Sequence, residues 1–193
     1  MNRIIFILVI LFSISSNAEL RERPNQWAKP IIGSSLENFY KVDEGVYRSQ
    51  QPSKEEFADL SIFGITDVLN LREYHDDNDE AAIFKLNRHR IPMRTGSITQ
   101  QQIIDALKII QKRDKAVVVH CWHGSDRTGA TIAAYRIIFN NWTKQQAIDE
   151  LKNGGYGYHA SIYPNIVKLI ENLDVENIKN SLGIQASLKT ISK

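Results

Sequence analysis

The chain has 193 residues, a length that fits a single domain of ordinary size. Its hydrophobic fraction of 42% and charged fraction of 24% are typical of a globular protein, which excludes a collagen-like, wholly disordered or multi-span membrane protein. Lys and Arg total 24 against 22 acidic residues, and this net charge of +2 gives no support to a nucleic-acid partner or a polybasic membrane surface.

Residues 1–18 have the pattern of a secretory signal peptide. Arg3 supplies a positive charge, residues 4–12 form an unbroken apolar run, and small residues lead to a cleavage point after Ala18. The apolar run is too short to cross a bilayer core of about 30 Å as a helix. We therefore predict export to the periplasm or full secretion, without stable membrane insertion after cleavage. An uncleaved membrane anchor is the alternative.

The segments that follow the signal predict the start of a domain. Residues 19–37 are polar and interrupted by prolines, which predicts an extended lead-in. Short apolar segments at 39–42 and 46–48 flank an Asp-Glu-Gly turn and predict a hairpin. Ser53 opens a capping-box pattern for a helix that ends at Gly64.

Strand and helix patterns alternate along the rest of the chain. Further strands are predicted over 65–71, 88–91 and 116–120. Helical segments are predicted as a turn over 81–86 and as helices that open at Thr99, span 128–140 and 143–153, and begin near Pro164. This alternation favours an α/β fold of three layers, in which helices flank a mainly parallel central sheet over residues 38–174. Residues 175–193 are predicted to form a C-terminal helix and tail.

The most informative segment surrounds the single cysteine, Cys121, which can form no internal disulfide and no cysteine-built metal site. A Val-rich strand ends at His120, a loop follows, and a helix begins near Thr128. A helix start presents free N–H groups and the positive end of its dipole, so this loop can cradle an anion. Gly124 permits the backbone angles of such a loop, and the Arg127 guanidinium suits phosphate oxygens.

A thiol at the base of that cradle is a candidate nucleophile. The helix N-terminus, the loop amides and the guanidinium all stabilise the thiolate of Cys121 relative to the thiol. A thiolate that faces a bound phosphate can attack phosphorus. The alternative for a lone cysteine is a buried structural residue, which is common in protein cores.

The pattern His-Cys-X5-Arg-Thr, at residues 120–128, resembles the signature loop of the protein tyrosine phosphatase superfamily. Segments 45–52, 68–72 and 133–136 are similar to compact dual-specificity phosphatases, and the match is nearest to the bacterial exported tyrosine phosphatases of the TpbA type. The resemblance covers roughly residues 40 to 158. It implies a dual-specificity phosphatase fold and hydrolysis of phosphotyrosine, and it leaves phosphoserine and phosphothreonine open as further substrates.

By that resemblance, Cys121 is the nucleophile that forms a phosphocysteine intermediate. Arg127 binds phosphate and the transition state, and the Thr128 hydroxyl helps the thiolate to leave. His120 orients and activates the cysteine from behind. The phosphate-binding residues, whose amides complete the cradle, are Trp122, His123, Gly124, Ser125, Asp126 and Arg127. The resemblance implies no metal and no cofactor.

The chain departs from the family over the general acid, an aspartate that the family carries in a loop upstream of the cysteine. The equivalent residues 91–99 contain no carboxylate, and Gly96 lies near the expected position. Asp126 is the first substitute, since myotubularin-type lipid phosphatases carry an aspartate at this offset. The alternative for Asp126 is a carboxylate paired with a basic neighbour. Further alternatives are an enzyme without an acid, or one that uses the acidic-loop residues Asp76, Asp77 and Asp79.

We therefore predict a monomeric phosphomonoesterase that acts on a phosphorylated protein or a small phosphorylated substrate. A phosphatase of inositol phosphates or phosphoinositides is the alternative. Asp126 favours it, Arg94 could reach a second phosphate, and the absence of a loop lysine argues against it. A phosphate-binding pseudo-phosphatase is an alternative of another class. Gly96 favours it, whereas the intact Cys121 and Arg127 argue against it.

Overall fold

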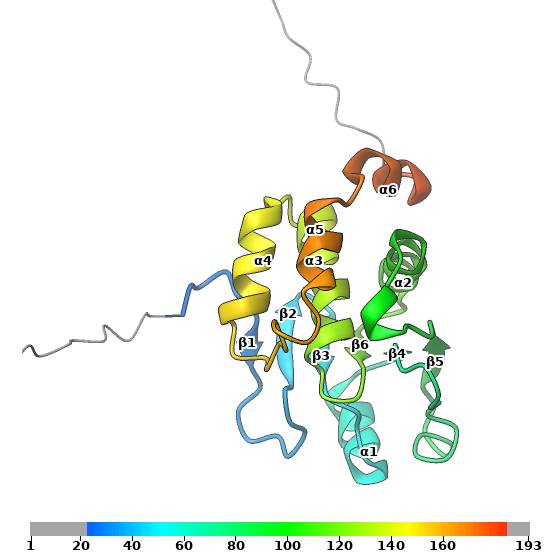
Figure 1. Ribbon diagram of the computed structural model, residues 1–193. Coiled ribbons are helices and arrows are strands. Elements are labelled where there is room, and N and C mark those ends of the chain that lie inside the picture. The colour runs from blue at the N-terminus through cyan, green and yellow to red at the C-terminus, as the bar shows by residue number, and fades with distance from the viewer. Residues whose placement is uncertain (1–22, 185–193) are drawn as a thin grey trace, which may run out of the picture.

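The computed structural model describes residues 23–184, so the predicted signal peptide lies outside the described residues. Within that range six strands form one sheet in the order β1-β2-β3-β6-β4-β5 (Figure 1). The strands are β1 (Lys29–Pro30), β2 (Tyr40–Asp43), β3 (Val46–Ser49), β4 (Asp67–Asn70), β5 (Asn87–Arg90) and β6 (Val117–His120). Strands β3, β6, β4 and β5 pair in parallel, whereas β1, β2 and β3 pair antiparallel. The predicted α/β fold with a mainly parallel sheet is confirmed.

Helices cover both faces of this sheet (Figure 1). They are α1 (Lys54–Phe63), α2 (Gln100–Lys112), α3 (Asp126–Phe139), α4 (Lys144–Asn153), α5 (Asn165–Glu171) and α6 (Val175–Ser181), with a 3₁₀ turn η1 at Thr95–Ser97. Helix α1 lies on one face, and the other helices gather around α3 on the opposite face. Among the described residues, no helix is both long enough and apolar enough to span a membrane.

The core consists of two apolar clusters, one on each side of the sheet. Val117 and Val119 of β6 belong to the larger cluster, which packs against α2 and α3, whereas Val118 belongs to the cluster under α1. Successive side chains of a strand point to opposite faces, so β6 is buried on both. This accounts for its continuous apolar sequence and fixes the position of the residues that follow it.

Local signals predicted the helix boundaries well. Ser53, Thr99 and Thr143 each form a capping box, and Gly64 ends α1 with a positive φ of 99°. Segment 81–86, predicted as a turn, contains hydrogen-bonded turns. Two details differ from the predictions. Helix α3 begins at Asp126, two residues early, and the two-residue edge strand β1 lies within the predicted lead-in.

The parallel strands place their carboxyl ends side by side. Ser49 at the end of β3 and Asn70 at the end of β4 both lie in register with His120 at the end of β6. In open α/β sheets this edge is where ligands bind. Cys121 is therefore the first residue beyond the middle strand of that edge.

Candidate active site

The loop that follows β6 has the features of an anion cradle. Cys121 is 2% exposed, and α3 begins after Ser125, so the loop leads directly into a helix N-terminus. The amides of residues 122–125 donate to no backbone carbonyl among residues 23–184. Free N–H groups at a helix start form a binding site for phosphate-like anions.

Strand β3 holds this loop in shape at Gly124. The φ of Gly124 is 71°, and a Cβ there would overlap the Ser49 carbonyl. The Gly124 carbonyl accepts a 2.6 Å hydrogen bond from Nη2 of Arg48. Arg48 is 1% exposed, and its guanidinium carbon lies 3.6 Å from the ring centroid of Tyr156. A buried cation thus fixes a loop that is 76 residues away in sequence.

The first turn of α3 contributes polar atoms without protein partners. Nε of Arg127 and Oγ1 of Thr128 are buried and make no hydrogen bond within the described residues. Nη1 of Arg127 lies 3.5 Å from the carbonyl oxygen of Met93. Buried polar atoms are normally hydrogen-bonded, so unpartnered ones at a helix start indicate a place for a ligand.

Behind the cysteine, His120 is fixed by a buried carboxylate. Its Nε2 lies 3.0 Å from Oδ2 of Asp77, while Oδ1 of Asp77 accepts hydrogen bonds from Gln51 and Asn70 at 2.8 and 3.0 Å. Burial raises the pKa of Asp77, but the hydrogen bond and charge of His120 and the amide hydrogen bonds bring the net pKa below its ordinary value. Asp77 therefore lies behind Cys121 as a carboxylate and not over the pocket as a mobile acid.

Asp126 faces a residue that lies 33 positions further along the chain. Its Oδ1 accepts a 3.0 Å hydrogen bond from the backbone N–H of His159, and its Oδ2 lies 2.9 Å from Nδ1 of the same residue. Asp126 is 8% exposed. The contact is the pairing with a basic neighbour that the sequence left open as the alternative for Asp126.

A cavity of about 340 Å³ opens beside the loop. It is lined by Thr95, Trp122, His123, Asp126, Arg127, His159, Ile162 and Tyr163. Trp122 is 58% exposed, and the Arg72 guanidinium carbon lies 4.3 Å from its ring centroid. This contact with Trp122 places a second guanidinium near the loop, and burial and the positive charge of Arg127 lower the pKa of Arg72. The cavity combines apolar walls with a cationic end.

Residues 42–141 match the protein family described as a DSP-PTPase phosphatase of polymorphic toxin systems. The chain belongs to this phosphatase family. The predicted membership of the protein tyrosine phosphatase superfamily, in its dual-specificity group, is therefore confirmed.

Individual relatives of this phosphatase agree with the family match. The dual specificity protein phosphatase TpbA of Pseudomonas aeruginosa is 29% identical over 139 residues, which are 70% of this chain and 62% of TpbA. The chain therefore spans less than two thirds of that relative. Inositol diphosphatase DSP3 of Arabidopsis thaliana is 27% identical over 155 residues, which are 75% of this chain and 74% of DSP3.

The crystal structure of a cysteine-to-serine variant of TpbA in complex with phosphotyrosine superposes on the phosphatase with a TM-score of 0.75. That alignment is 24% identical and covers 84% of this chain and 99% of the TpbA chain. The likeness in structure shows that the two chains share their fold.

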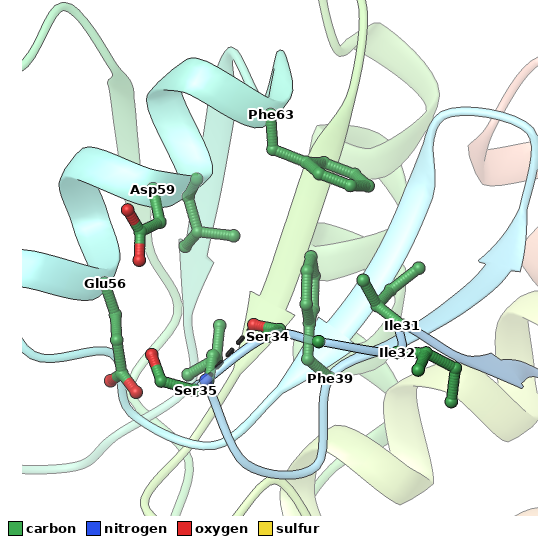
Figure 2. A pocket seen from close by; sticks show the side chains of 11 residues that line it. Ile31, Ile32, Ser34, Ser35, Phe39, Glu56, Asp59 and Phe63 are labelled. Carbon is green, nitrogen blue, oxygen red and sulfur yellow. Dashed lines mark hydrogen bonds between the residues drawn. The ribbon is translucent and has the colours of Figure 1, made fainter.

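A larger cavity of about 520 Å³ shares no residue with the cysteine loop of the phosphatase. It lies between segment 31–39 and α1 (Figure 2). Phe39 and Phe63 meet on one side of it with ring centroids 5.5 Å apart, and Glu56 and Asp59 lie on another (Figure 2). Its lining includes neither the cysteine nor the arginine of the loop, and the phosphate-binding features lie elsewhere.

One group of potential metal ligands is present among residues 23–184. Ligand atoms of His75, Asp77 and Glu80 lie within 4.8 Å of one another. Both oxygens of Asp77 already accept hydrogen bonds, one of them from His120, and Nε2 of His75 lies 3.1 Å from Oε1 of Glu80. The Asp77 carboxylate is therefore engaged by His120 beside the phosphatase loop, and we propose no metal here.

Sequence reasoning missed several supports of the phosphatase site. Arg48 lies within the resembling segment 45–52, but nothing local in the sequence shows that it holds Gly124. Asp77 was considered only as a mobile acid, and the pairing of His159 with Asp126 was not foreseen. Nothing local distinguishes Asp77 from the other acidic residues of its loop, because only the strand order brings it next to His120.

Proposed function

We propose that this phosphatase hydrolyses phosphotyrosine through a phosphocysteine intermediate on Cys121. The observation that carries the proposal is the loop itself. It begins with a buried cysteine, its amides donate to no carbonyl in the described part of the chain, and it ends in the unpartnered polar atoms of Arg127 and Thr128. These features match the two needs of phosphoryl transfer, which are a positioned nucleophile and donors for the oxygens of the transferring group.

In the first step, the Cys121 thiolate donates an electron pair to phosphorus, and the bond from phosphorus to the ester oxygen breaks. The loop amides and the Arg127 guanidinium bind the three other phosphoryl oxygens, where charge is spread in the transition state. In the second step, water attacks phosphorus and the bond from phosphorus to sulfur breaks. The Thr128 hydroxyl can donate to the departing thiolate, since it has no other described partner.

His120 supports the nucleophile from behind. Because the Asp77 carboxylate can only accept, Nε2 of His120 carries a proton toward it. This contact fixes the imidazole, whose Nδ1 lies 3.4 Å from the Cys121 carbonyl oxygen. We propose that it orients the start of the loop.

The cavity walls support an aryl substrate. Trp122, Ile162 and Tyr163 flank the space next to Arg127, so an aromatic ring attached to a bound phosphate would meet apolar surface. The relative TpbA was crystallised with phosphotyrosine. Phosphoserine and phosphothreonine bring no ring to these walls, and we rank them below phosphotyrosine as substrates.

Inositol phosphates are the second candidate substrates. Arg72 provides a second guanidinium near the loop, since it stacks on Trp122, and this suits a substrate with several phosphates. Relatives such as DSP3 are named inositol diphosphatases. Arg94 is exposed at the start of η1 and could contribute further charge.

A substrate panel tests the proposal. The purified protein is given a phosphotyrosine peptide, a phosphoserine peptide and inositol hexakisphosphate, and inorganic phosphate release is measured for each. We expect the phosphotyrosine peptide to be hydrolysed fastest and Cys121→Ser to abolish release while still binding the peptide. Dominant turnover of the inositol phosphate overturns the substrate assignment, full activity of Cys121→Ser overturns the mechanism, and binding without turnover identifies a pseudo-phosphatase.

We also propose that the protein is exported and acts as a monomer. Export is inferred from residues 1–18, and N-terminal sequencing of the protein from a bacterial periplasm should find a start after Ala18. An uncleaved N-terminus would contradict this assignment. Light scattering after size-exclusion chromatography should give the mass of one chain.

A further inference from the structure

We propose that His159 is the proton-transfer residue of this site and that Asp126 is the carboxylate that positions it. This inference rests on the proposed phosphocysteine mechanism and supplies the step for which the sequence offers no family residue. His159 would donate a proton to the leaving oxygen and then accept one from the attacking water.

The contact between the two side chains fixes which nitrogen of His159 is available. Oδ2 of Asp126 lies 2.9 Å from Nδ1. A carboxylate only accepts hydrogen bonds, so Nδ1 carries a proton and donates it to Asp126. Nε2 makes no hydrogen bond among the described residues and is the nitrogen left for chemistry. A carboxylate that holds a histidine tautomer in this way is a recurring arrangement in enzymes.

The backbone around His159 is held as firmly as its ring. Its N–H donates to Oδ1 of Asp126 at 3.0 Å, and its carbonyl accepts from the amides of Ile162 and Tyr163 at 3.0 and 2.9 Å. Two residues earlier, Gly157 has a φ of 75° and packs beside Ser125 of the cysteine loop. The turn that carries His159 is thus attached directly to the phosphate cradle.

His159 lines the same cavity as Arg127. The side chain of His159 is 41% exposed, whereas that of Asp126 is 11% exposed, so the carboxylate is enclosed and the imidazole is accessible to solvent. The titratable or charged groups around the imidazole are Asp126 from α3, His123 and Arg127 from the loop and helix start, and Tyr163. A second cavity that His159 also lines adds Glu37, Tyr40 and Tyr156.

The carboxylates of the chain fit this role less well. Residues 91–99 contain no carboxylate, and Asp77 is enclosed behind the cysteine by His120. Asp126 could act alone only by releasing both of its contacts to His159. An imidazole exchanges protons near neutral pH, which is the property that a general acid and base requires.

The two steps balance in protons. As the Cys121 sulfur bonds to phosphorus, the ester oxygen leaves with the electron pair of its broken bond and takes the proton from Nε2 of His159. In the second step, water adds its oxygen to phosphorus and gives a proton back to Nε2, and the thiolate leaves with the electron pair of the sulfur–phosphorus bond. His159 and Cys121 end as they began.

The test compares leaving groups. Rates against pH are measured for p-nitrophenyl phosphate, whose phenolate leaves without help, and for phenyl phosphate, whose phenolate needs a proton. His159→Gln should lower kcat/KM for phenyl phosphate by about 100-fold or more and affect p-nitrophenyl phosphate much less. It should also remove the fall in the rate of phenyl phosphate hydrolysis at alkaline pH. Asp126→Asn should have the same selectivity with a smaller loss.

His89→Gln is the matched control, because it removes an imidazole that lies 2.9 Å from the Asp67 carboxylate, away from the loop. His89→Gln should leave kcat/KM unchanged for both substrates. Affinity for orthovanadate reports whether each variant keeps its phosphate cradle, and rescue of His159→Ala by added imidazole reports the proton step even where stability falls.

Several results would overturn the assignment. If His159→Gln loses kcat/KM equally for both substrates, and imidazole does not rescue His159→Ala, then His159 has only a structural role. A selective loss in Asp126→Asn but not in His159→Gln would make Asp126 itself the acid. If the unmodified protein hydrolyses neither substrate, or if Cys121→Ser does so at the full rate, the proposed function fails instead, which is a separate outcome.

Discussion

Replacing Gly124 by alanine should damage the phosphate cradle far more than it damages the fold. The residue has a φ of 71°, and a Cβ would overlap the carbonyl oxygen of Ser49 and lie 2.6 Å from its carbonyl carbon and 2.8 Å from the nitrogen of Gln50. These are backbone atoms at the end of β3, which is paired on both sides within the sheet. The loop, and not the strand, has to move.

The free-energy cost of Gly124→Ala has two parts. Alanine in the left-handed region costs about 1–2 kcal/mol, and overlap with fixed neighbours typically adds about 1–3 kcal/mol. If the overlap is relieved by displacing the loop amides, the second part appears as lost binding of the transition state. That corresponds to about a 5- to 150-fold fall in kcat/KM for p-nitrophenyl phosphate.

Gly64→Ala is the matched control. Gly64 has a φ of 99°, but a Cβ there meets nothing within 4 Å, so only the backbone part of about 1–2 kcal/mol applies. Urea unfolding gives the stability of each variant, and orthovanadate titration reports the loop. If Gly124→Ala matches Gly64→Ala in both stability and kcat/KM, the contact between the loop and β3 does not shape the cradle.

Four further predictions follow from individual contacts. Nε of Arg136 donates to a Glu150 carboxylate oxygen at 2.9 Å. Glu150→Ala leaves the Arg136 guanidinium buried without this carboxylate and should destabilise the fold by about 3–5 kcal/mol. A fall in Tm would show the loss. Gly96→Asp places a carboxylate where a Cβ meets nothing within 4 Å; in the His159→Gln variant it should restore part of kcat/KM for phenyl phosphate, whereas Gly96→Asn should not. Asp77 has a pKa below the ordinary 3.8, because its hydrogen bonds outweigh its burial. The stability that it contributes is therefore present above that pH and is lost as the pH falls below it. In urea titrations on either side of pH 3.8, Asp77→Asn should reduce the fall in the free energy of unfolding at acid pH. Peroxide should inactivate the enzyme and dithiothreitol restore it, since the chain has no second cysteine to form a protective disulfide with Cys121; activity that resists peroxide would contradict a reactive thiolate.

The elements predicted best were those whose signals are local. The capping boxes at Ser53 and Thr99 each depend on residues three positions apart, and both are present. The Val-rich strand and the loop after it were equally visible, because a buried strand, a glycine and a helix start follow one another directly. Strand β1 was missed, since two residues acquire strand geometry only through pairing with β2.

The supports of the site were not predictable, because they join distant segments. Arg48 reaches Gly124 across 76 residues, and Asp77 reaches His120 across 43. Both contacts depend on the order β3-β6-β4, which places the ends of separate strands next to the cysteine loop. The same limit applies to the general acid, since the sequence showed that residues 91–99 lack a carboxylate but gave no means of placing another group at the pocket.

Trapping the covalent intermediate tests the central claim most directly. The enzyme is mixed with p-nitrophenyl phosphate, quenched in the steady state, digested and analysed by mass spectrometry, with Cys121→Ser treated in parallel. We predict one phosphoryl group on the peptide that contains Cys121, attached to sulfur, and none on the variant. Turnover with the phosphoryl group on another residue, or with no phosphorylated peptide at any time, would contradict the assignment of Cys121 as the nucleophile.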